Sequence, residues 1–528
     1  MRLNKNIYND REVWESKGYH IPEFDRRAVA ERTSRQPRWL HFGAGNIFRA
    51  FLARAMSGLL EQGKTDTGII VAEGYDRDII EDIYIPHDLL SISVNVDSRG
   101  NMEKSIVNSV TEALYADPGS DRRLKEIFEN PSLSIVSFTI TEKGYEACDP
   151  MDETSFLGLL VRLLLARYQS GGFPLALVSM DNCSRNGWRL WQAVHSIAGA
   201  WEACGRAPEG FVRYIDNPER ISFPWTMIDK ITPRPSDVVQ KALEKDGIEG
   251  IINIETKKHT YIASFVNAEA FECLVIEDAF PNGRPPFEAA GFLMADRMHV
   301  ELAEKMKVCA CLNPLHTALA VFGCLLGKET IAEAMEDVAL YQLAYRLGFD
   351  EGLPVVSDPE ILSPRRFLEC VLKERLRNPF IPDTPARIAT DTSHKIPIRF
   401  GQTVTAWQQA KNRDQPGLKM IPLVLAGWCR YLMGTDDSGN RIELSKDSRL
   451  QTLCPVMEAM AGQAKGLPYE ERQQIIADFM APLFDDQFLW GCDLRRGGLD
   501  QVVVQNLNSM MSGPGSVYKT LWGIVFGE

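Results

Sequence analysis

The sequence predicts an α/β fold, with a doubly wound parallel sheet in the N-terminal part of the chain and a largely α-helical C-terminal part. Two observations predict it. Short apolar runs alternate with helical segments over the first half of the chain, which is typical of buried parallel strands joined by crossover helices. After the Pro- and Gly-rich stretch at 279–291, strand signals become sparse and long helical periodicity takes over. We therefore predict a polar N-terminal extension at 1–36, a sheet domain at 37–285 and a helical domain at 286–528.

The elements of the sheet domain follow one another in an informative order. A strand in RWLHFGAG leads through glycines into a helix at about 47–62, and a second strand follows in TGIIVAEGYD. Apolar runs at 133–140 and 174–180 predict two more buried strands, and the apolar segment SFLGLLVRLLLARYQ between them predicts a crossover helix. Strand, glycine turn, helix and strand in succession form the opening unit of a Rossmann-type domain.

Composition excludes several classes of function. The chain has 528 residues, enough for about two to four domains. Its formal net charge of −13 opposes an electrostatic grip on nucleic acid or anionic lipid, so we expect neither as a partner. No apolar run reaches the roughly 18 residues of a membrane span, and the polar start lacks the apolar core of an export signal. Together with 11 cysteines, an odd count that fits reduced thiols, this favours a cytoplasmic protein.

The first candidate site is the glycine turn GAGNIFR, which runs from Gly43 to Arg49. Two glycines after a strand let the backbone turn sharply and bring a helix N-terminus against a pyrophosphate. The third glycine of the usual fingerprint is missing, so a plain strand-to-helix turn is the alternative reading. We predict contacts with a dinucleotide from the following residues: Gly43, Gly45, Asn46, Ile47 and Arg49.

Glu73, at the end of the second strand, is the next test of a dinucleotide site. An acid at that place binds the ribose hydroxyls of NAD and repels the additional phosphate of NADP. The sequence therefore predicts NAD as the cofactor, with Asp76 as a substitute for Glu73. A solvated loop acid is the alternative.

Two further polar segments follow buried strands. In SMDNCSRNG, we predict a cofactor contact from Asp181 and substrate contacts from Asn182 and Asn186, because the carboxyl ends of parallel strands line the ligand crevice. A cap on the next helix is the alternative for the asparagines. TITEKGY stands in the equivalent place after another strand, and there we predict cofactor contacts from Thr139 and Thr141.

Polar groups also stand among apolar residues of the helical domain. Lys307, Asn313 and His316 lie in EKMKVCACLNPLHTALA, and a buried lysine with amide and imidazole neighbours is a candidate for proton transfer. A snorkelling surface lysine and a satisfied core histidine are the alternatives. Cys309 and Cys311 have no companion at zinc-ligand spacing, so we expect no metal site.

A basic segment follows in FIPDTPARIATDTSHKIPIRFG. Four basic residues gather there within thirteen positions: Arg387, His394, Lys395 and Arg399. In an acidic chain, such a cluster among apolar and turn residues indicates capture of an anionic or polyhydroxylated small ligand. A solvated charge group is the alternative.

Taken together, these segments resemble the polyol-specific long-chain dehydrogenase family, also called the mannitol dehydrogenase family. The likeness runs from HFGAGNIFRAF through TITEKGY, ALVSMDNCSRNG, FPWTMIDKITPRP and MKVCACLNPLH to ARIATDTSHKIPIRFG. It implies a metal-independent active site in the cleft between a Rossmann-type domain and a helical domain. It also implies catalytic roles for Lys307, Asn313, His316 and Asn182, and substrate contacts from Asp229, Arg387 and Lys395.

The activity implied by the resemblance is reversible hydride transfer between nicotinamide and a secondary alcohol carbon of a linear sugar acid. Within the family the likeness is greatest to the hexuronate reductases, which favours D-mannonate and D-fructuronate as substrates. Altronate with tagaturonate, mannitol with fructose, and sugar phosphates stay open, as does the oligomeric state. A non-catalytic nucleotide sensor is the alternative from another class, although a sensor needs none of Lys307, Asn313 and His316.

The chain departs from the family pattern in two places. Phe48 and Phe51 stand where the family has histidines, so no cofactor role for those histidines carries over. The spacing from Lys307 to Asn313 is also one residue longer than in the mannitol enzymes. Nine steps of 100° place Lys307 and His316 about 180° apart on a regular helix, so they share a site only if one residue is absorbed as a π-bulge. Because Pro314 lacks an N–H group and crowds the preceding turn, we predict a widened turn or kink between Lys307 and Pro314.

Overall fold

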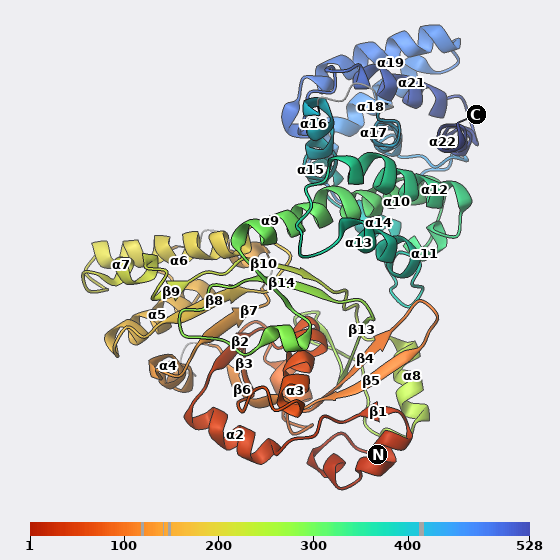
Figure 1. Ribbon diagram of the computed structural model, residues 1–528. Coiled ribbons are helices and arrows are strands. Elements are labelled where there is room, and N and C mark those ends of the chain that lie inside the picture. Colours follow the sequence, from red (N-terminus) through yellow and green to blue (C-terminus); the bar gives the residue numbers. More distant parts are fainter. Residues whose placement is uncertain (118–120, 141, 146–148, 411–416, 528) are drawn as a thin grey trace. The chain divides into compact units, whose positions relative to one another are not determined.

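The structure is a computed structural model that describes residues 1–117, 121–140, 142–145, 149–410 and 417–527 (Figure 1). It divides into two compact units, Met1–Glu301 and Leu302–Glu528. The sequence predicts a boundary near residue 285, whereas the first unit continues to Glu301. The difference arises because β15 (Leu293–Ala295) still pairs with β14 (Cys273–Glu277) and so extends a sheet of the first unit.

The main sheet of the first unit has six strands in the order β6-β3-β2-β7-β8-β9, and every pairing in it is parallel. The strands are β2 (Trp39–Phe42), β3 (Ile69–Glu73), β6 (Val110–Tyr115), β7 (Ile135–Phe138), β8 (Leu175–Ser179) and β9 (Ile221–Ser222). The chain starts at β2, moves outward through β3 to β6, and returns to β7 on the other side of β2. This order creates a switch point between β2 and β7, where doubly wound sheets bind ligands. The predicted doubly wound sheet is confirmed.

Side chains alternate between the two faces of the main sheet, and each face packs into its own hydrophobic core. Leu40 and Phe42 of β2 pack with α4 (Arg122–Glu129), α5 (Phe156–Gln169) and α6 (Asn186–Ala203) on one face. On the other face, Trp39 packs with η2 (Phe48–Ala53) and α3 (Arg54–Glu61), which follow the glycine turn. The predicted helix at about 47–62 therefore exists, but its first part, η2, is a π-helix.

Smaller sheets complete the first unit. One has the order β1-β5-β4-β13, with bounds β1 (Tyr19–His20), β4 (Ser91–Val96), β5 (Met102–Val107) and β13 (Phe265–Glu269). A second has the order β10-β14-β15, where β10 is Thr226–Asp229, and a hairpin joins β11 (Ile254–Glu255) to β12 (Tyr261–Ile262). Because β1 pairs with β5, the N-terminal extension at 1–36 is part of the folded unit, and it also forms η1 (Lys5–Tyr8), α1 (Arg11–Ser16) and α2 (Arg26–Arg35).

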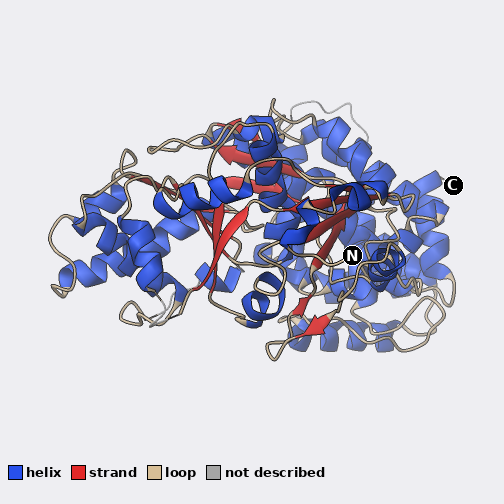
Figure 2. Cartoon of the chain, turned by 90° about the horizontal axis from the view of Figure 1, so that it is seen from below, coloured by secondary structure: helices blue, strands red, loops and turns tan. Residues whose placement is uncertain are grey.

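The second unit is built from helices, and its described residues contain only one isolated β-bridge, between Thr435 and Arg441 (Figure 2). The elements that carry candidate residues are η6 (Lys307–Cys311), α10 (Asn313–Leu325), α14 (Pro385–Ala389), α15 (Thr392–Ile396) and η10 (Pro397–Gly401). Helix α10 packs against α14 and α17 (Met420–Tyr431), and α17 packs against α21 (Leu499–Met510).

One helical stretch, Arg297–Leu325, is long and apolar enough to pass a test for a membrane span on length and composition. It consists of α9 (Arg297–Met306), η6 and α10. The sequence predicts no such run, because charged residues such as Glu304 and Lys307 interrupt the apolar residues of this stretch. Its apolar window is 72% buried within the protein, as expected for a core helix of a globular chain, and it is weak evidence for a membrane.

Candidate active site

The glycine turn has the geometry of a phosphate cradle. Gly43 has a φ of +109°, and a Cβ atom there would lie 2.5 Å from Thr139 Oγ1, so only glycine fits. A Cβ atom on Gly45 would meet nothing within 4 Å, so open space adjoins the backbone at this position. The helix that begins with η2 follows, and a helix N-terminus beside open space suits a pyrophosphate. The turn therefore fits the predicted dinucleotide, with Thr139 packed against it.

Glu73 has a structural task that the sequence does not reveal. It is buried, and its carboxylate accepts backbone hydrogen bonds from Ala44 at 2.8 Å, Tyr75 at 2.8 Å and Asp76 at 3.1 Å. Glu73 thus ties the glycine turn to the end of β3. Asp76 is also buried and accepts a hydrogen bond from Thr256 Oγ1 at 2.6 Å. Neither acid is the solvated loop residue of the alternative reading.

Arg49 is fully buried behind the turn. Its guanidinium donates to Ala263 O at 2.7 Å and to Asn46 Oδ1 at 2.9 Å, while Nε has no partner among the described residues. Burial lowers the pKa of Arg49. In this structure its side chain therefore holds Asn46 in place from within the core, while Ile47 lies at the entry to η2.

His41, which sequence reasoning missed, lies beneath the turn. Its ring stacks on Phe48 at a centroid distance of 4.3 Å, and its two nitrogens lie 2.6 Å from Ser137 Oγ and 3.1 Å from Thr139 Oγ1. Complete burial lowers the pKa of His41 to about 3, so the ring is neutral. Phe48, which stands where the family has a histidine, therefore fills a hydrophobic place in the core.

Asp181, just after β8, is coupled to the phenol of Tyr145, which follows β7. Tyr145 hydrogen-bonds to the carboxylate of Asp181 and lies 2.8 Å from Ser179 Oγ. Burial raises the pKa values of both Asp181 and Tyr145. Asn182, the next residue, is exposed, and Thr141 lies outside the described residues.

Asn186 links two sheets. It is fully buried, its Nδ2 donates to Thr226 Oγ1 at 2.9 Å, and its Oδ1 accepts from Thr226 N at 3.1 Å. Because its Nδ2 also donates to Ser179 O at 3.2 Å, Asn186, at the start of α6, fastens the end of β8 to β10. The other predicted substrate residue of this unit, Asp229, is the buried last residue of β10.

A buried ion network next to Asp229 was missed by sequence reasoning. The Nζ of Lys230 donates to Asn95 Oδ1 at 3.2 Å, to Glu269 O at 3.0 Å and to Glu272 Oε2 at 2.9 Å. Glu272 also pairs with Arg54. The signal in the sequence was a lone lysine inside the apolar strand segment PWTMIDKI, but its partners are distant in the chain.

In the second unit, the predicted deformation between Lys307 and Pro314 is confirmed. Residues Lys307–Cys311 form the π-helix η6, and Leu312 N donates to Lys307 O at 3.1 Å, five residues back. Leu312 then leaves the helical region, with φ −129° and ψ −64°, and Asn313 and Pro314 begin α10. Lys307 is buried, with 7% of its surface exposed.

Four elements, namely α10, α14, α15 and η10, each contribute one basic side chain to what we call the basic cluster: His316, Arg387, Lys395 and Arg399. His316 Nε2 lies 3.5 Å from Asp383 Oδ2, and Arg387 forms an ion pair with the same carboxylate. Lys395 Nζ donates to the backbone carbonyl groups of Ile388, at 2.9 Å, and Thr390. His394 lies apart from them and contacts Ser448 Oγ at 2.7 Å.

The electrostatics of the basic cluster follow from its burial and its like charges. Burial, and then the charges of Arg399 and Arg387, lower the pKa of His316 to about 3, so its imidazole is neutral. Burial and Arg399 lower the pKa of Lys395 to about 8. Burial raises the pKa of the Cys309 thiol to about 12, which makes it a poor nucleophile.

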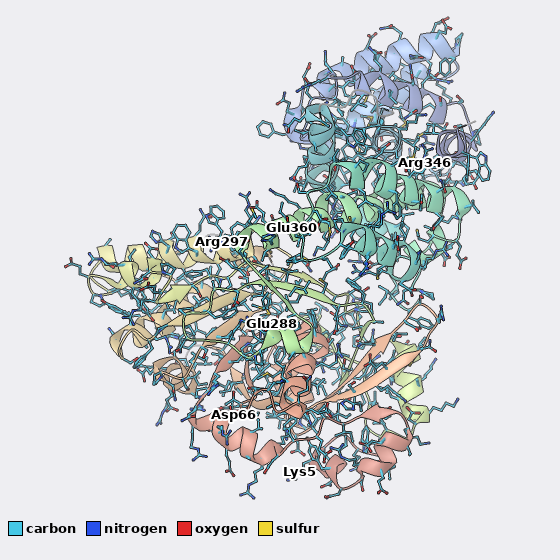
Figure 3. The ribbon with its side chains drawn as sticks, viewed as in Figure 1. Lys5, Asp66, Glu288, Arg297, Arg346 and Glu360 are labelled. Carbon is cyan, nitrogen blue, oxygen red and sulfur yellow. The ribbon has the colours of Figure 1, made fainter. Side chains whose placement is uncertain are left out.

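The described residues contain no group of three or more histidines, cysteines or acids that could hold a metal ion. They do contain a cavity of about 670 Å³ in the first unit, lined by aromatic residues that include Trp188, Trp191 and Trp225. Arg297, which is labelled in Figure 3, borders the cavity. Its guanidinium lies over the ring of Trp225, and its Nε lies 3.1 Å from Glu277 Oε1. No predicted site residue lines this cavity.

Known proteins match this chain over its whole length. The model of the mannitol dehydrogenase Rossmann domain matches residues 37–289, and that of the mannitol dehydrogenase C-terminal domain matches residues 299–484. A D-mannonate oxidoreductase of Thermotoga maritima is 45% identical over 100% of both chains. A mannitol 2-dehydrogenase of Neosartorya fischeri is 30% identical over 90% of this chain and 89% of its own.

Solved structures agree in fold. The mannitol 2-dehydrogenase of Pseudomonas fluorescens, in a ternary complex with NAD and D-mannitol, matches with a TM-score of 0.72 at 22% identity over 100% of both chains. A D-sorbitol dehydrogenase in substrate-free form matches with a TM-score of 0.71 at 24% identity, over 92% of this chain and 97% of its own. The resemblance seen in the motifs is thereby confirmed, and the chain belongs to the mannitol dehydrogenase family.

Proposed function

We propose that this chain is an NAD-dependent dehydrogenase that interconverts D-mannonate and D-fructuronate. The similarity to a D-mannonate oxidoreductase over the full length of both chains supports the reaction. The observation in the structure that carries the proposal is the basic cluster beside Asn313, because a negatively charged sugar acid requires cations where a neutral polyol does not.

NAD is the cofactor, and when bound it accepts the hydride at C4 of its nicotinamide. The residues that would hold it are those of the glycine turn, where the space beside Gly45 leaves room for a pyrophosphate. Glu73 keeps its predicted role toward the ribose in addition to its backbone contacts. Asp181 and Thr139, at the ends of β8 and β7, border the same edge of the sheet.

The chain's own residues accept the proton of the reacting hydroxyl and stabilise its oxygen. In the direction of oxidation, Lys307 takes the proton of the reacting hydroxyl, and Asn313 donates a hydrogen bond to the oxygen as its negative charge develops. We assign the same donor role to Asn182 on the first unit. His316 is neutral and can donate one hydrogen bond to a sugar hydroxyl, while Arg387 and Lys395 orient the acid. Amides and cations thus replace a metal ion.

Several proposals accompany this activity. The substrate is a small sugar acid, neither nucleic acid nor a membrane is a partner, and the enzyme works in the cytoplasm. A tagaturonate reductase or a mannitol 2-dehydrogenase is the alternative within the family. A nucleotide sensor is disfavoured because Lys307, Asn313 and His316 are all present.

The test is NADH oxidation by the purified chain with fructuronate, tagaturonate, fructose and fructose phosphate. We expect the highest kcat/KM with fructuronate. A higher value with tagaturonate or fructose would assign the chain to the corresponding alternative. NADH binding without turnover of any of the four would support the sensor.

A further inference from the structure

Arg399 differs from the other cations of the basic cluster in what its guanidinium contacts. Its Nη1 donates to Thr317 Oγ1 at 2.6 Å and to Asn313 O at 3.4 Å. Both acceptors are neutral. Within the part of the chain that the structure describes, no carboxylate forms an ion pair with Arg399.

The neighbouring cations are already compensated or occupied. Arg387 shares an ion pair with Asp383, and His316 is neutral beside the same acid. Lys395 uses two of its protons on backbone carbonyl groups. Among the described residues, neither Lys395 nor Arg399 forms an ion pair with a carboxylate, but Lys395 directs its protons to carbonyl groups, whereas Arg399 contacts its two neutral acceptors through Nη1 alone.

The position of Arg399 suits a ligand. Asn313 and Thr317 stand on either side of His316 in the first turns of α10, so the guanidinium lies beside two proposed catalytic groups. The contacts of Nη1 fix the plane of the guanidinium and leave Nε and Nη2, which form the fork that a carboxylate binds with two parallel hydrogen bonds.

We propose that Arg399 binds the carboxylate of the sugar acid and sets the preference for a uronate over a neutral sugar. This assignment rests on the proposed function, since only an acidic substrate supplies the anion. Burial lowers the pKa of Arg399 to about 10, so the group remains charged at neutral pH. Among the charged neighbours, Arg399 also lowers the pKa of both His316 and Lys395 the most, so the three groups interact electrostatically.

The test compares acidic and neutral ligands in Arg399→Gln. Fructuronate and fructose differ in one terminal group, carboxylate against CH₂OH, and D-mannonate and D-mannitol form a second such pair that needs no turnover when used as inhibitors. We expect Arg399→Gln to raise KM for fructuronate and the inhibition constant of mannonate about ten- to hundredfold, the scale of a charged hydrogen bond. The values for fructose and mannitol should change by less than about twofold.

Arg430→Gln is the matched control. Arg430 is also a buried guanidinium on neutral acceptors, since it donates to Thr435 O at 2.8 Å and Asp436 O at 2.9 Å. Its loss should leave the preference for acids unchanged. Equal effects of Arg399→Gln on acidic and neutral ligands would overturn the proposal and leave Arg399 as a structural tie to α10.

Failure of the proposed function and failure of the variant to fold can each be told apart from failure of the Arg399 proposal. If the unaltered enzyme itself shows no preference for fructuronate over fructose, the proposed function fails, whatever Arg399 does. If Arg399→Gln does not fold, Arg399→Lys decides, because it keeps the charge but loses the fork. It should raise KM for fructuronate several-fold with fructose unaffected, and an equal change for both sugars would contradict the proposal.

Discussion

Two of the π-helices that carry candidate residues, η2 and η6, end in different ways. The residues on both sides of η2, Ile47 and Arg54, have regular helical angles, so the helix continues into α3 without a break. All six residues of η2 are buried, and Arg49 points into the core. By contrast, η6 ends at Leu312, which leaves the helical region, and a new helix begins at Asn313. The first bulge anchors a binding turn, whereas the second precedes a break that re-aims a helix.

This difference assigns separate tasks to the two regions. Changes around η6 and the basic cluster should alter turnover and the binding of the sugar acid. Changes around the glycine turn should alter cofactor preference and the stability of the first unit.

The largest effect is expected from Lys307→Ala. Loss of the general base should reduce kcat by about a hundredfold or more, while NADH binding stays nearly unchanged. Steady-state kinetics and a fluorescence titration with NADH measure the two quantities. Lys305→Ala is the control, because Lys305 is exposed two residues away. Normal turnover of Lys307→Ala would move the base elsewhere, with Lys305 the first to test.

Arg387→Lys should weaken the use of fructuronate by about tenfold or more, on roughly 1.5 to 3 kcal/mol for a charged hydrogen bond. A lysine keeps the positive charge, but its single ammonium group cannot form the paired hydrogen bonds of a planar guanidinium, which can bind Asp383 and a substrate oxygen at the same time. Measured KM and kcat that both match the unaltered enzyme would remove Arg387 from the site. The test can readily fail, because 63% of the Arg387 side chain is exposed and an exposed charge contributes little to binding.

The enzyme should prefer NAD to NADP, and Glu73→Ser should improve the use of NADPH relative to NADH about fivefold or more, because one like charge near the 2′-phosphate is removed. The same change should destabilise the first unit by about 1 to 3 kcal/mol, since Ala44, Tyr75 and Asp76 lose a shared acceptor. Kinetics with both cofactors and thermal melts measure the two effects. Equal efficiency of the unaltered enzyme with both cofactors would refute the preference, and unchanged NADPH use by Glu73→Ser would shift the assignment to Asp76.

Binding of the acid should depend on pH through Lys395. Its pKa is lowered to about 8, so the ammonium is charged below that pH and loses its charge above it. The dissociation constant of D-mannonate from the complex with NADH should therefore rise several-fold, at most about tenfold, between pH 7 and 9. Calorimetry at the two pH values measures it without turnover. Lys395→Met should abolish the dependence, and an undiminished dependence in that variant would point to another group.

The smallest effect is expected from chelators. In the proposed mechanism amides and cations stabilise the developing oxyanion, so EDTA should leave kcat unchanged. Assays before and after prolonged dialysis against EDTA measure this. Activity that is lost in EDTA and returns with Zn²⁺ would contradict the metal-independent mechanism.

The sequence predicts the central strands well, because each is a short apolar run bounded by turn residues. It also predicts η6, since two independent signals, the spacing of the motif and Pro314, coincide there. No proline and no spacing anomaly marks η2, and the sequence predicts a regular helix in its place.

Other features depend on contacts that no local pattern encodes. The three backbone bonds of Glu73 form only when the glycine turn and the end of β3 lie side by side. The partners of Lys230 lie on two separate segments, one at 269–272 and one at Asn95, which is 135 residues away. The hairpin of β4 and β5 did leave a local signal, the alternating apolar residues of SISVNV before the turn residues DSRGN, which sequence reasoning passed over.

The π-turn of η6 has a consequence for how such an enzyme can evolve. An insertion inside a regular helix rotates everything beyond it by about 100°, which would swing Asn313 and His316 away from any site they share with Lys307. A single wide turn takes up the added residue locally, and the break at Leu312 isolates α10 from it. The segment between Lys307 and Asn313 is therefore a place where the gene can gain or lose one codon while the proposed catalytic groups on α10 keep their orientation.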